Sequence, residues 1–315
     1  MNPREHGHDS GQNVFEMYTK VAMDPIKEIE GFDYGEWNTG AFGEKSEAEF
    51  TVISKLCKAK AQTSVGGPQS KYRNNEDAVF VISRPNRFAV GIIDGAGGSR
   101  NGLLAAQIAS AEFARGIKND QGTTNIIEEV NSVMRINSNG GYATGVILEI
   151  DKDTREATIV GAGDSKAMTL RKVKKVEEGT THFQNVAQRG VDTGNILPHE
   201  YYTNGRLNEI TGGFGIPNDV KAEPPEIKKF IPQEGDIIIL ASDGFWDNIS
   251  EYEVEQIVAT TSDFKDLENT LFTLAYQRNN DPKEFEIKHD ARTIVRKKLT
   301  SGDNITVAVV EINNI

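Results

Sequence analysis

The order of strand-like and helix-like segments is the feature that most restricts the fold of this 315-residue chain. Short runs rich in β-branched residues and bounded by Gly, Asp or Asn predict strands at 77–83, 87–94, 141–151, 156–164, 166–172, 235–243 and 304–312. Apolar residues at three- and four-residue spacing predict helices at 102–117, 125–136, 251–261 and 264–278. Because this order is not a regular βαβ alternation, we expect an α+β fold with antiparallel sheets flanked by helices.

The chain divides into a polar N-terminal segment and a longer patterned part. We interpret residues 1–45 as an extension and residues 46–315 as one domain. Residues 173–210 are rich in Gly, His, Asn and charge, and they interrupt the strand pattern. Since a long irregular span inside a compact domain is usually functional, we predict a flap there. A second irregular, charged span covers 278–298.

Charge and cysteine content exclude several classes of protein. Asp and Glu number 47 against 35 Lys and Arg, and the net charge of −12 repels nucleic-acid phosphates and anionic lipid. No apolar run approaches the about 18 residues of a membrane span, and the N-terminus lacks the apolar core of a secretory signal. Cys57 is the only cysteine, which excludes an intramolecular disulfide. We therefore expect a cytoplasmic protein that binds neither nucleic acid nor membranes.

Acidic residues stand at the ends of several predicted strands, beside Gly or Asn. The stretches are NNEDAVF, GIIDGAGG, LASDGFWD and SGDNITV, with Glu76, Asp77, Asp94, Asp243 and Asp303. Any one of these acids alone is most simply a turn residue. Together at one end of a sheet, they would repel one another unless cations neutralise them. Oxygen ligands without His or Cys suit Mg²⁺ or Mn²⁺, and two such ions can activate a water and hold a phosphoryl oxygen.

These stretches, in this order, resemble the metal-dependent protein phosphatases, the type 2C serine/threonine family. The stretches GYATGVILEI, IVGAGDSKAM and NGRLNEITGGFG add to the resemblance, which extends from about residue 50 to residue 313. It implies two antiparallel sheets packed as a sandwich, with helices outside and metals in a cleft at one end. It also implies hydrolysis of phosphoserine or phosphothreonine in a phosphorylated protein substrate by a hydroxide bridging two Mn²⁺ or Mg²⁺ ions. Family members are commonly monomers, so we expect a monomer here.

The resemblance assigns metal ligands position by position. Asp94 is similar to the carboxylate that bridges both metals. The carbonyl oxygen of Gly95 is similar to a ligand of one of them. Glu76 matches the acid of the second metal site, whereas Asp243 and Asp303 match ligands of the first.

Two further acids receive roles from the same resemblance. Asp77 is similar to the acid that orients metal-bound water, and with Asp94 and Asp243 it completes the catalytic carboxylates. Asp164, in the stretch GAGDS, matches an acid of a third and weaker metal site that many members also form with Asp243.

The chain departs from the family pattern at two positions. Ala96 stands where animal members have a His that protonates the leaving group, and this makes the stretch DGAGG more similar to bacterial members. General acid catalysis contributes about 10²-fold or more, so its loss need not abolish activity. The usual phosphate-binding Arg falls on Tyr72, between Lys71 and Arg73. Either Arg73 or Lys71 could bind the substrate phosphate after a local shift, or both are surface residues.

Two other functions stay open at this point. An inactive family member would bind phosphoproteins as a scaffold, but such proteins typically lose metal acids, and Glu76, Asp94, Asp243 and Asp303 are all present. A phosphatase for a small phosphorylated metabolite is the other alternative, because an open acidic cleft has no substrate pocket that a sequence reveals.

Overall fold

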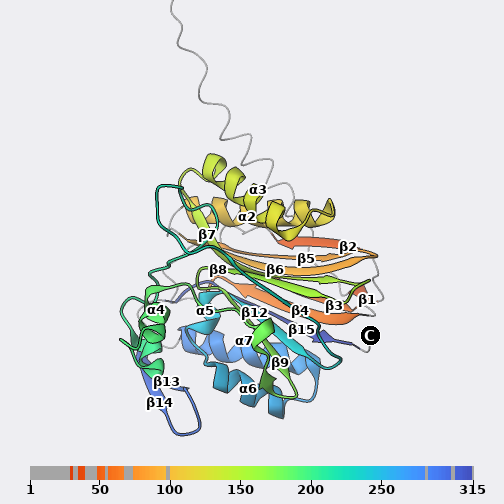
Figure 1. Cartoon of the computed structure of the whole chain (residues 1–315). Helices are drawn as coiled ribbons and strands as arrows, with labels where there is room; N and C mark the ends of the chain where they lie inside the picture. The colour runs from red at the N-terminus through yellow and green to blue at the C-terminus, as the bar shows by residue number, and fades with distance from the viewer. Residues whose placement is uncertain are drawn as a thin grey trace, which may run out of the picture.

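Two β-sheets packed face to face form the centre of the protein (Figure 1). The computed structural model describes residues 29–30, 35–39, 48–53, 56–66, 74–96, 100–280, 283–298 and 302–313. The seven-stranded sheet has the order β1 (Ile29–Glu30), β3 (Ala48–Ile53), β4 (Cys57–Ser64), β15 (Ile305–Ile312), β12 (Ile237–Ala241), β9 (Lys166–Arg171) and β10 (Lys174–Lys175). The six-stranded sheet has the order β11 (Glu226–Phe230), β8 (Ala157–Ala162), β7 (Tyr142–Asp151), β6 (Arg87–Ala96), β5 (Asp77–Ser83) and β2 (Gly35–Thr39). Apart from the parallel pair β1 and β3, neighbouring strands are antiparallel.

Helices cover the outer faces of both sheets (Figure 1). The helices α2 (Arg100–Lys118) and α3 (Thr123–Asn137) lie on the six-stranded sheet, and α6 (Glu251–Thr260) and α7 (Phe264–Asn280) on the seven-stranded one. Shorter elements are η1 (Glu177–Gly179), α4 (Val186–Asp192), η2 (Pro198–Thr203), α5 (Asp243–Trp246) and the hairpin of β13 (Glu284–Lys288) and β14 (Ile294–Lys298). The predicted α+β sandwich with flanking helices is confirmed.

The central strands are buried on both faces, which explains their continuous apolar sequences. Every residue of β5 is buried. Phe80 and Ile82 belong to the cluster under α2 and α3, whereas Val79 and Val81 belong to the cluster between the sheets. A one-residue slip of register would exchange these two sets, so the packing fixes where each strand ends. The acidic residues at those ends are thereby placed as well.

Two spans that the sequence suggested to be irregular contain short regular elements. The predicted flap, 173–210, includes β10, η1, α4 and η2, and the span 278–298 includes β13 and β14. Tyr201 and Leu207 of the first span form one buried apolar cluster with Phe285 and Ile287 of the second. The hairpin escapes sequence analysis because each of its strands has only five residues, with few apolar positions among charged ones. The role of 173–210 as a flap stays a prediction.

Two described strands precede residue 46. The strand β1 pairs with β3 in the seven-stranded sheet, and β2 pairs with β5 in the six-stranded sheet. Each of these parts of the predicted extension therefore belongs to one of the two sheets. The division at residue 45 stays a prediction.

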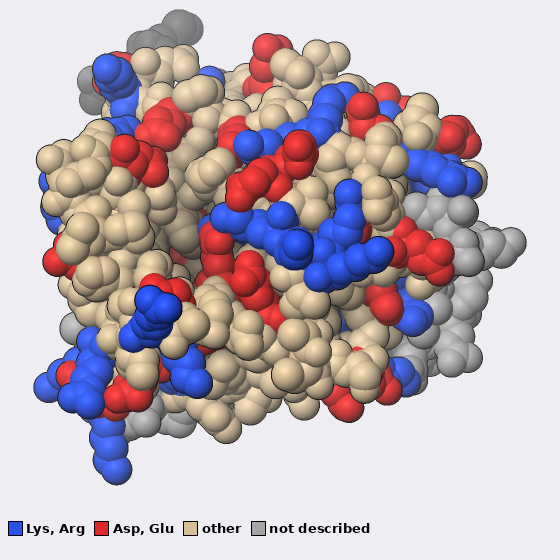
Figure 2. Space-filling model, turned by 60° about the horizontal axis from the view of Figure 1, so that its bottom comes forward, with Lys and Arg blue, Asp and Glu red and all other residues tan. Residues whose placement is uncertain are grey.

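The surface carries charges of both signs. Figure 2 shows basic and acidic side chains next to one another on one face. Exposed ion pairs such as Arg206 with Glu209 contribute little to stability, because water and salt screen them. No helix in the described ranges is both long enough and apolar enough to cross a membrane.

Candidate active site

Acidic side chains from both sheets meet at one end of the sandwich. Asp77 and Asp94 are direct cross-strand neighbours on β5 and β6, and Glu76 immediately precedes β5. From the other sheet, Asp243 follows β12 at the start of α5, and Asp303 lies just before β15. Asp164 follows β8. We call Glu76, Asp77, Asp94, Asp164, Asp243 and Asp303 the acidic cluster.

Asp94 lies at the centre of the acidic cluster. Its carboxyl group is within hydrogen-bonding reach of Asp77 on one side and of Asp243 on the other. One oxygen of Asp77 and one of Asp243, each named Oδ1, are buried and accept no hydrogen bond from an N–H or O–H group of the described residues. Buried polar atoms without partners are rare in native proteins. A cation between these carboxylates would satisfy both oxygens.

Burial and neighbouring carboxylates raise the pKa values of both Asp94 and Asp243. Burial, followed by repulsion from Asp77 and Asp303, raises the pKa of Asp94 well above its usual value. Burial, followed by repulsion from Asp94 and Asp303, does the same to the pKa of Asp243. Without a cation, these carboxyl groups therefore resist being ionised together.

Glu76 and Asp164 show the same effect. Burial raises the pKa of Glu76 to about 7, and repulsion from Asp77 and Asp303 adds to it. Burial also raises the pKa of Asp164 to about 7, with repulsion from Asp247 as the next contribution. A divalent cation would favour the ionised forms, and a donor set made only of oxygen fits Mg²⁺ or Mn²⁺.

The acidic cluster surrounds a space and does not form a closed cage. Within the described residues, no three His, Cys, Asp or Glu side chains are close enough together to define the position of an ion by themselves. Such an arrangement suits Mg²⁺, which usually keeps several of its waters and takes only one or two carboxylates directly.

Two glycines allow the backbone to close around the acidic cluster. A Cβ atom at Gly102, in the first turn of α2, would lie 2.4 Å from Oε2 of Glu76 and 2.5 Å from the carbonyl oxygen of Gly95. A Cβ atom at Gly244 would lie 1.9 Å from the carbonyl oxygen of Asn304. Only glycine permits these approaches. The Gly95 carbonyl and the Glu76 carboxylate consequently face the same narrow space, which fits their expected roles as ligands.

Hydroxyl groups hold Asp77 in one orientation. Thr306 Oγ1 and Ser242 Oγ donate hydrogen bonds to Asp77 Oδ2 at 2.6 Å and 2.9 Å. Thr63 Oγ1 lies 2.7 Å from Thr306 Oγ1 and accepts a hydrogen bond from Asn75 Nδ2 at 2.8 Å. Because this network uses one oxygen of Asp77, the other is left for the site. The sequence pattern indicates Asp77 but none of these supporting residues.

Amide side chains hold the segments that carry Asp303 and Glu76. Asn279 of α7 donates to the carbonyl oxygen of Asp303 at 2.9 Å and accepts from the Asp303 N–H at 3.1 Å. Asn304 Oδ1 accepts a hydrogen bond from the N–H of Glu76 at 2.8 Å. These bonds couple the two segments expected to bind different metals.

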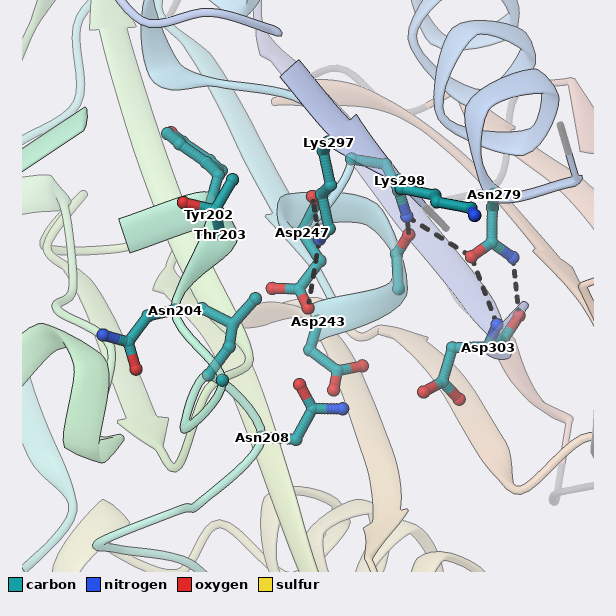
Figure 3. Close-up of a pocket in the computed structure, with 14 residues that line it drawn as sticks. Tyr202, Thr203, Asn204, Asn208, Asp243, Asp247, Asn279, Lys297, Lys298 and Asp303 are labelled. Atoms are coloured by element: carbon teal, nitrogen blue, oxygen red, sulfur yellow. Dashed lines mark hydrogen bonds and ion pairs between the residues drawn. The ribbon is translucent and has the colours of Figure 1, made fainter. Parts of the chain in front are cut away.

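A cavity of about 500 Å³ opens over Asp243 and Asp303 (Figure 3). Tyr202 and Asn208, from the predicted flap, contribute to one wall, and the end of β14 contributes to another. The cavity connects the acidic cluster with the flap and the hairpin, so a substrate bound there would contact all three.

The predicted contacts to the substrate phosphate are not placed. Arg73 and Lys71 lie outside the described residues, as does Tyr72. Ala96 is the last residue of β6, two residues beyond Asp94.

Comparisons with known proteins agree with the fold. The family model described as Stage II sporulation protein E (SpoIIE) matches residues 84–184. Protein phosphatase PhpP of Streptococcus pneumoniae is 26% identical over 266 residues, which are 80% of this chain and 96% of the relative. A solved bacterial serine phosphatase has a TM-score of 0.63 at 21% identity, covering 82% of this chain and 98% of its own. The catalytic domain of serine threonine protein phosphatase PstP, solved with two manganese ions, has a TM-score of 0.58 at 21% identity, covering 82% and 99%.

The chain is similar in sequence and in fold to the metal-dependent protein phosphatases of type 2C. It is an enzyme of the phosphatase class, and its solved structural relatives include bacterial members.

Removing divalent cations should make stability depend on pH. The pKa of Glu76 rises from 4.5 to about 7 on folding, and those of Asp77 and Asp164 rise from 3.8 to about 7. The stabilising contribution of an acid with a raised pKa is fully present below its unfolded pKa and is lost as pH rises through its folded pKa. We expect the free energy of unfolding in chelator to fall between about pH 4 and pH 8 by more than about 1.4 kcal/mol, the equivalent of one pKa unit. Urea unfolding with chelator and with Mn²⁺ measures this, and a stability that rises with pH in chelator would contradict it.

Thr306→Val tests the network that holds Asp77. We expect kcat for a phosphothreonine peptide to fall about tenfold, as for other residues that orient a metal site, because Asp77 loses its shortest hydrogen bond. Thr306→Ser keeps the hydroxyl group and should retain most of the activity. Thermal melting separates this effect from unfolding, and a valine variant with unchanged kcat would show that the network does not matter for catalysis.

Proposed function

We propose that the protein hydrolyses phosphoserine and phosphothreonine in phosphorylated proteins. The observation that carries this proposal is the position of Asp94 between Asp77 and Asp243, with the buried Oδ1 of Asp243 unpaired. Two Mn²⁺ or Mg²⁺ ions would be held by Glu76, Asp94, the Gly95 carbonyl, Asp243 and Asp303, and a third, weaker site would use Asp164. When bound, the ions would bridge and activate a hydroxide and polarise the phosphoryl oxygens. The two manganese ions in the PstP catalytic domain support this number.

The protein's own groups would orient the attack. Asp77, held by Thr306 and Ser242, presents its free Oδ1 to the attacking water and fixes its direction. The water oxygen bonds to phosphorus as the bond from phosphorus to the serine or threonine oxygen breaks, without a phosphoenzyme. Because Ala96 has no proton to give, the leaving oxygen takes its proton from water.

We further propose that the enzyme is a cytoplasmic monomer with phosphoproteins as its partners. The single cysteine supports the cytoplasmic location, because cysteine-poor chains are typical of reducing compartments. The acidic cluster also argues against an inactive scaffold, since a scaffold has no need for carboxylates that destabilise one another.

Phosphate release from a panel of substrates tests the proposal. With Mn²⁺ present, kcat/KM for phosphothreonine and phosphoserine peptides is expected to exceed that for small phosphorylated metabolites. A higher kcat/KM for a metabolite would identify small phosphorylated metabolites as the substrate class. Tight binding of phosphopeptides without any hydrolysis would identify a scaffold.

A further inference from the structure

The hairpin of β13 and β14 brings two lysine side chains to the cavity over Asp243 and Asp303. Lys297 and Lys298, at the end of β14, line the cavity together with Asp243 and Asp303. They are the basic residues among its described lining residues. Neither was singled out by the sequence, because both fall in the span taken as irregular.

Lys297 is already engaged by the protein. Its ammonium group donates a hydrogen bond to the carbonyl oxygen of Asp247 at 2.7 Å and lies 3.8 Å from Oδ2 of the same residue. Both side chains are 16% exposed. Lys297 therefore neutralises Asp247 and attaches β14 to the end of α5.

Lys298 has no such partner. Its side chain is exposed, and none of the described residues forms an ion pair or a hydrogen bond with its ammonium group. In Figure 3 it extends toward Asn279, on the Asp303 side of the cavity. An unpaired cation at this place offers attraction to an anion that approaches an otherwise acidic site in a chain of net charge −12.

The hairpin is held firmly enough to present Lys298 at a defined position. Arg278 of α7 binds Glu253 through two hydrogen bonds of 2.8 Å and donates to the carbonyl oxygen of Glu286 at 2.7 Å. The N–H of Lys288 donates to Glu253 Oε1 at 3.0 Å. On its other side, the hairpin packs against the predicted flap through the buried cluster that includes Phe285. Such support reduces the entropy lost when a substrate is bound.

We propose that Lys298 determines substrate preference by binding a second anionic group, a carboxylate or a phosphate, beside the scissile phosphate. This inference rests on the proposed function. The scissile phosphate belongs at the acidic cluster, whose members are buried or partly buried, whereas Lys298 is exposed at the rim. An anion held by Lys298 therefore lies outside the reacting group, on a neighbouring residue of the phosphorylated chain.

Kinetics with matched peptides test the role of Lys298. Three phosphothreonine peptides differ only in the neighbouring residue, which is Ala, Glu or a non-hydrolysable phosphonate analogue of phosphoserine. The wild-type enzyme with Mn²⁺ is expected to have about fivefold higher kcat/KM for both anionic peptides, mainly through KM, and this advantage should fade at high salt. The comparison of the two anionic peptides shows whether a carboxylate suffices or a phosphate is favoured.

Charge substitutions on the hairpin give the decisive comparison. Lys298→Glu is expected to reverse the preference, and Lys298→Arg to keep it. Lys288→Glu makes the same charge change on the same hairpin, at an exposed position that does not line the cavity, and should leave the preference unchanged. An equal preference in the wild type and in Lys298→Glu would overturn the proposal.

The inference and the proposed function can fail separately. Failure of the wild type to hydrolyse any of the peptides with Mn²⁺ would count against the proposed function. In that case fluorescence anisotropy of the labelled peptides decides the role of Lys298. Tighter binding of the anionic peptides to the wild type, lost in Lys298→Glu, would support it, and equal affinities would refute it.

Discussion

Replacing Asp94 with Asn is expected to lower kcat/KM for a phosphothreonine peptide by roughly a thousandfold. Asp94 lies within hydrogen-bonding reach of both Asp77 and Asp243, so it links acidic residues from the two sheets. Bound ions contribute several kcal/mol of charge stabilisation, and each 1.36 kcal/mol corresponds to a factor of ten. Phosphate release at saturating Mn²⁺ measures the loss.

Stability measurements distinguish this loss of activity from misfolding. Because Asp94 is repelled by Asp77 and Asp303, the amide should relieve repulsion and raise the melting temperature in chelator. Asp219→Asn, at an exposed turn and outside the acidic cluster, is the matched control and should change neither property. An Asp94→Asn enzyme with near-normal activity would remove Asp94 from the catalytic residues.

Replacing Lys60 with Met is expected to destabilise the protein by about 3–5 kcal/mol. Lys60 on β4 lies 2.9 Å from Glu268 on α7, and their side chains are 10% and 0% exposed. Removing the lysine leaves a buried carboxylate without its ion-pair partner, which costs far more than the pair itself contributes. The free energy of unfolding in urea provides the measurement.

A second variant and a second ion pair serve as controls. Replacing both residues, Lys60→Met with Glu268→Leu, should recover most of the stability, because two apolar side chains can fill the same space. On the same strand, Lys58 pairs with Glu311 at 2.9 Å, but these side chains are 40% and 28% exposed. Lys58→Met should therefore cost less than about 1 kcal/mol. Equal losses of unfolding free energy in Lys58→Met and Lys60→Met would mean that burial does not determine the cost of breaking the ion pair.

The fold was predictable because each local pattern agreed with the burial of its element. The run IIILA forms β12, which lies between β15 and β9. Asp243 follows the end of this strand and therefore lies at the cleft. The acids could be found for a related reason. A carboxylate directly after such a buried run needs a partner. Several stretches of this kind, in the order in which they occur, resembled one family.

The supporting residues could not be predicted, because their contacts depend on register and on packing between distant segments. Thr306 reaches Asp77 across 229 positions of the sequence. In the sequence, Lys60 does not differ from other lysines in strands, because its partner Glu268 lies on α7 and is distant along the chain. Lys298 acquires its position from a hairpin whose place is set by Arg278 and by the apolar cluster shared with the predicted flap.

Calorimetric titration with Mn²⁺ tests the central claim most directly, namely that the acidic cluster is a metal centre. We expect the wild type to bind two ions, with proton release at about pH 7 because the raised pKa values of Glu76 and Asp164 fall as the ions bind. We expect Asp94→Asn to lose this binding and Asp219→Asn to keep it. A wild-type protein that binds no Mn²⁺, or that binds it equally after Asp94→Asn, would contradict the account.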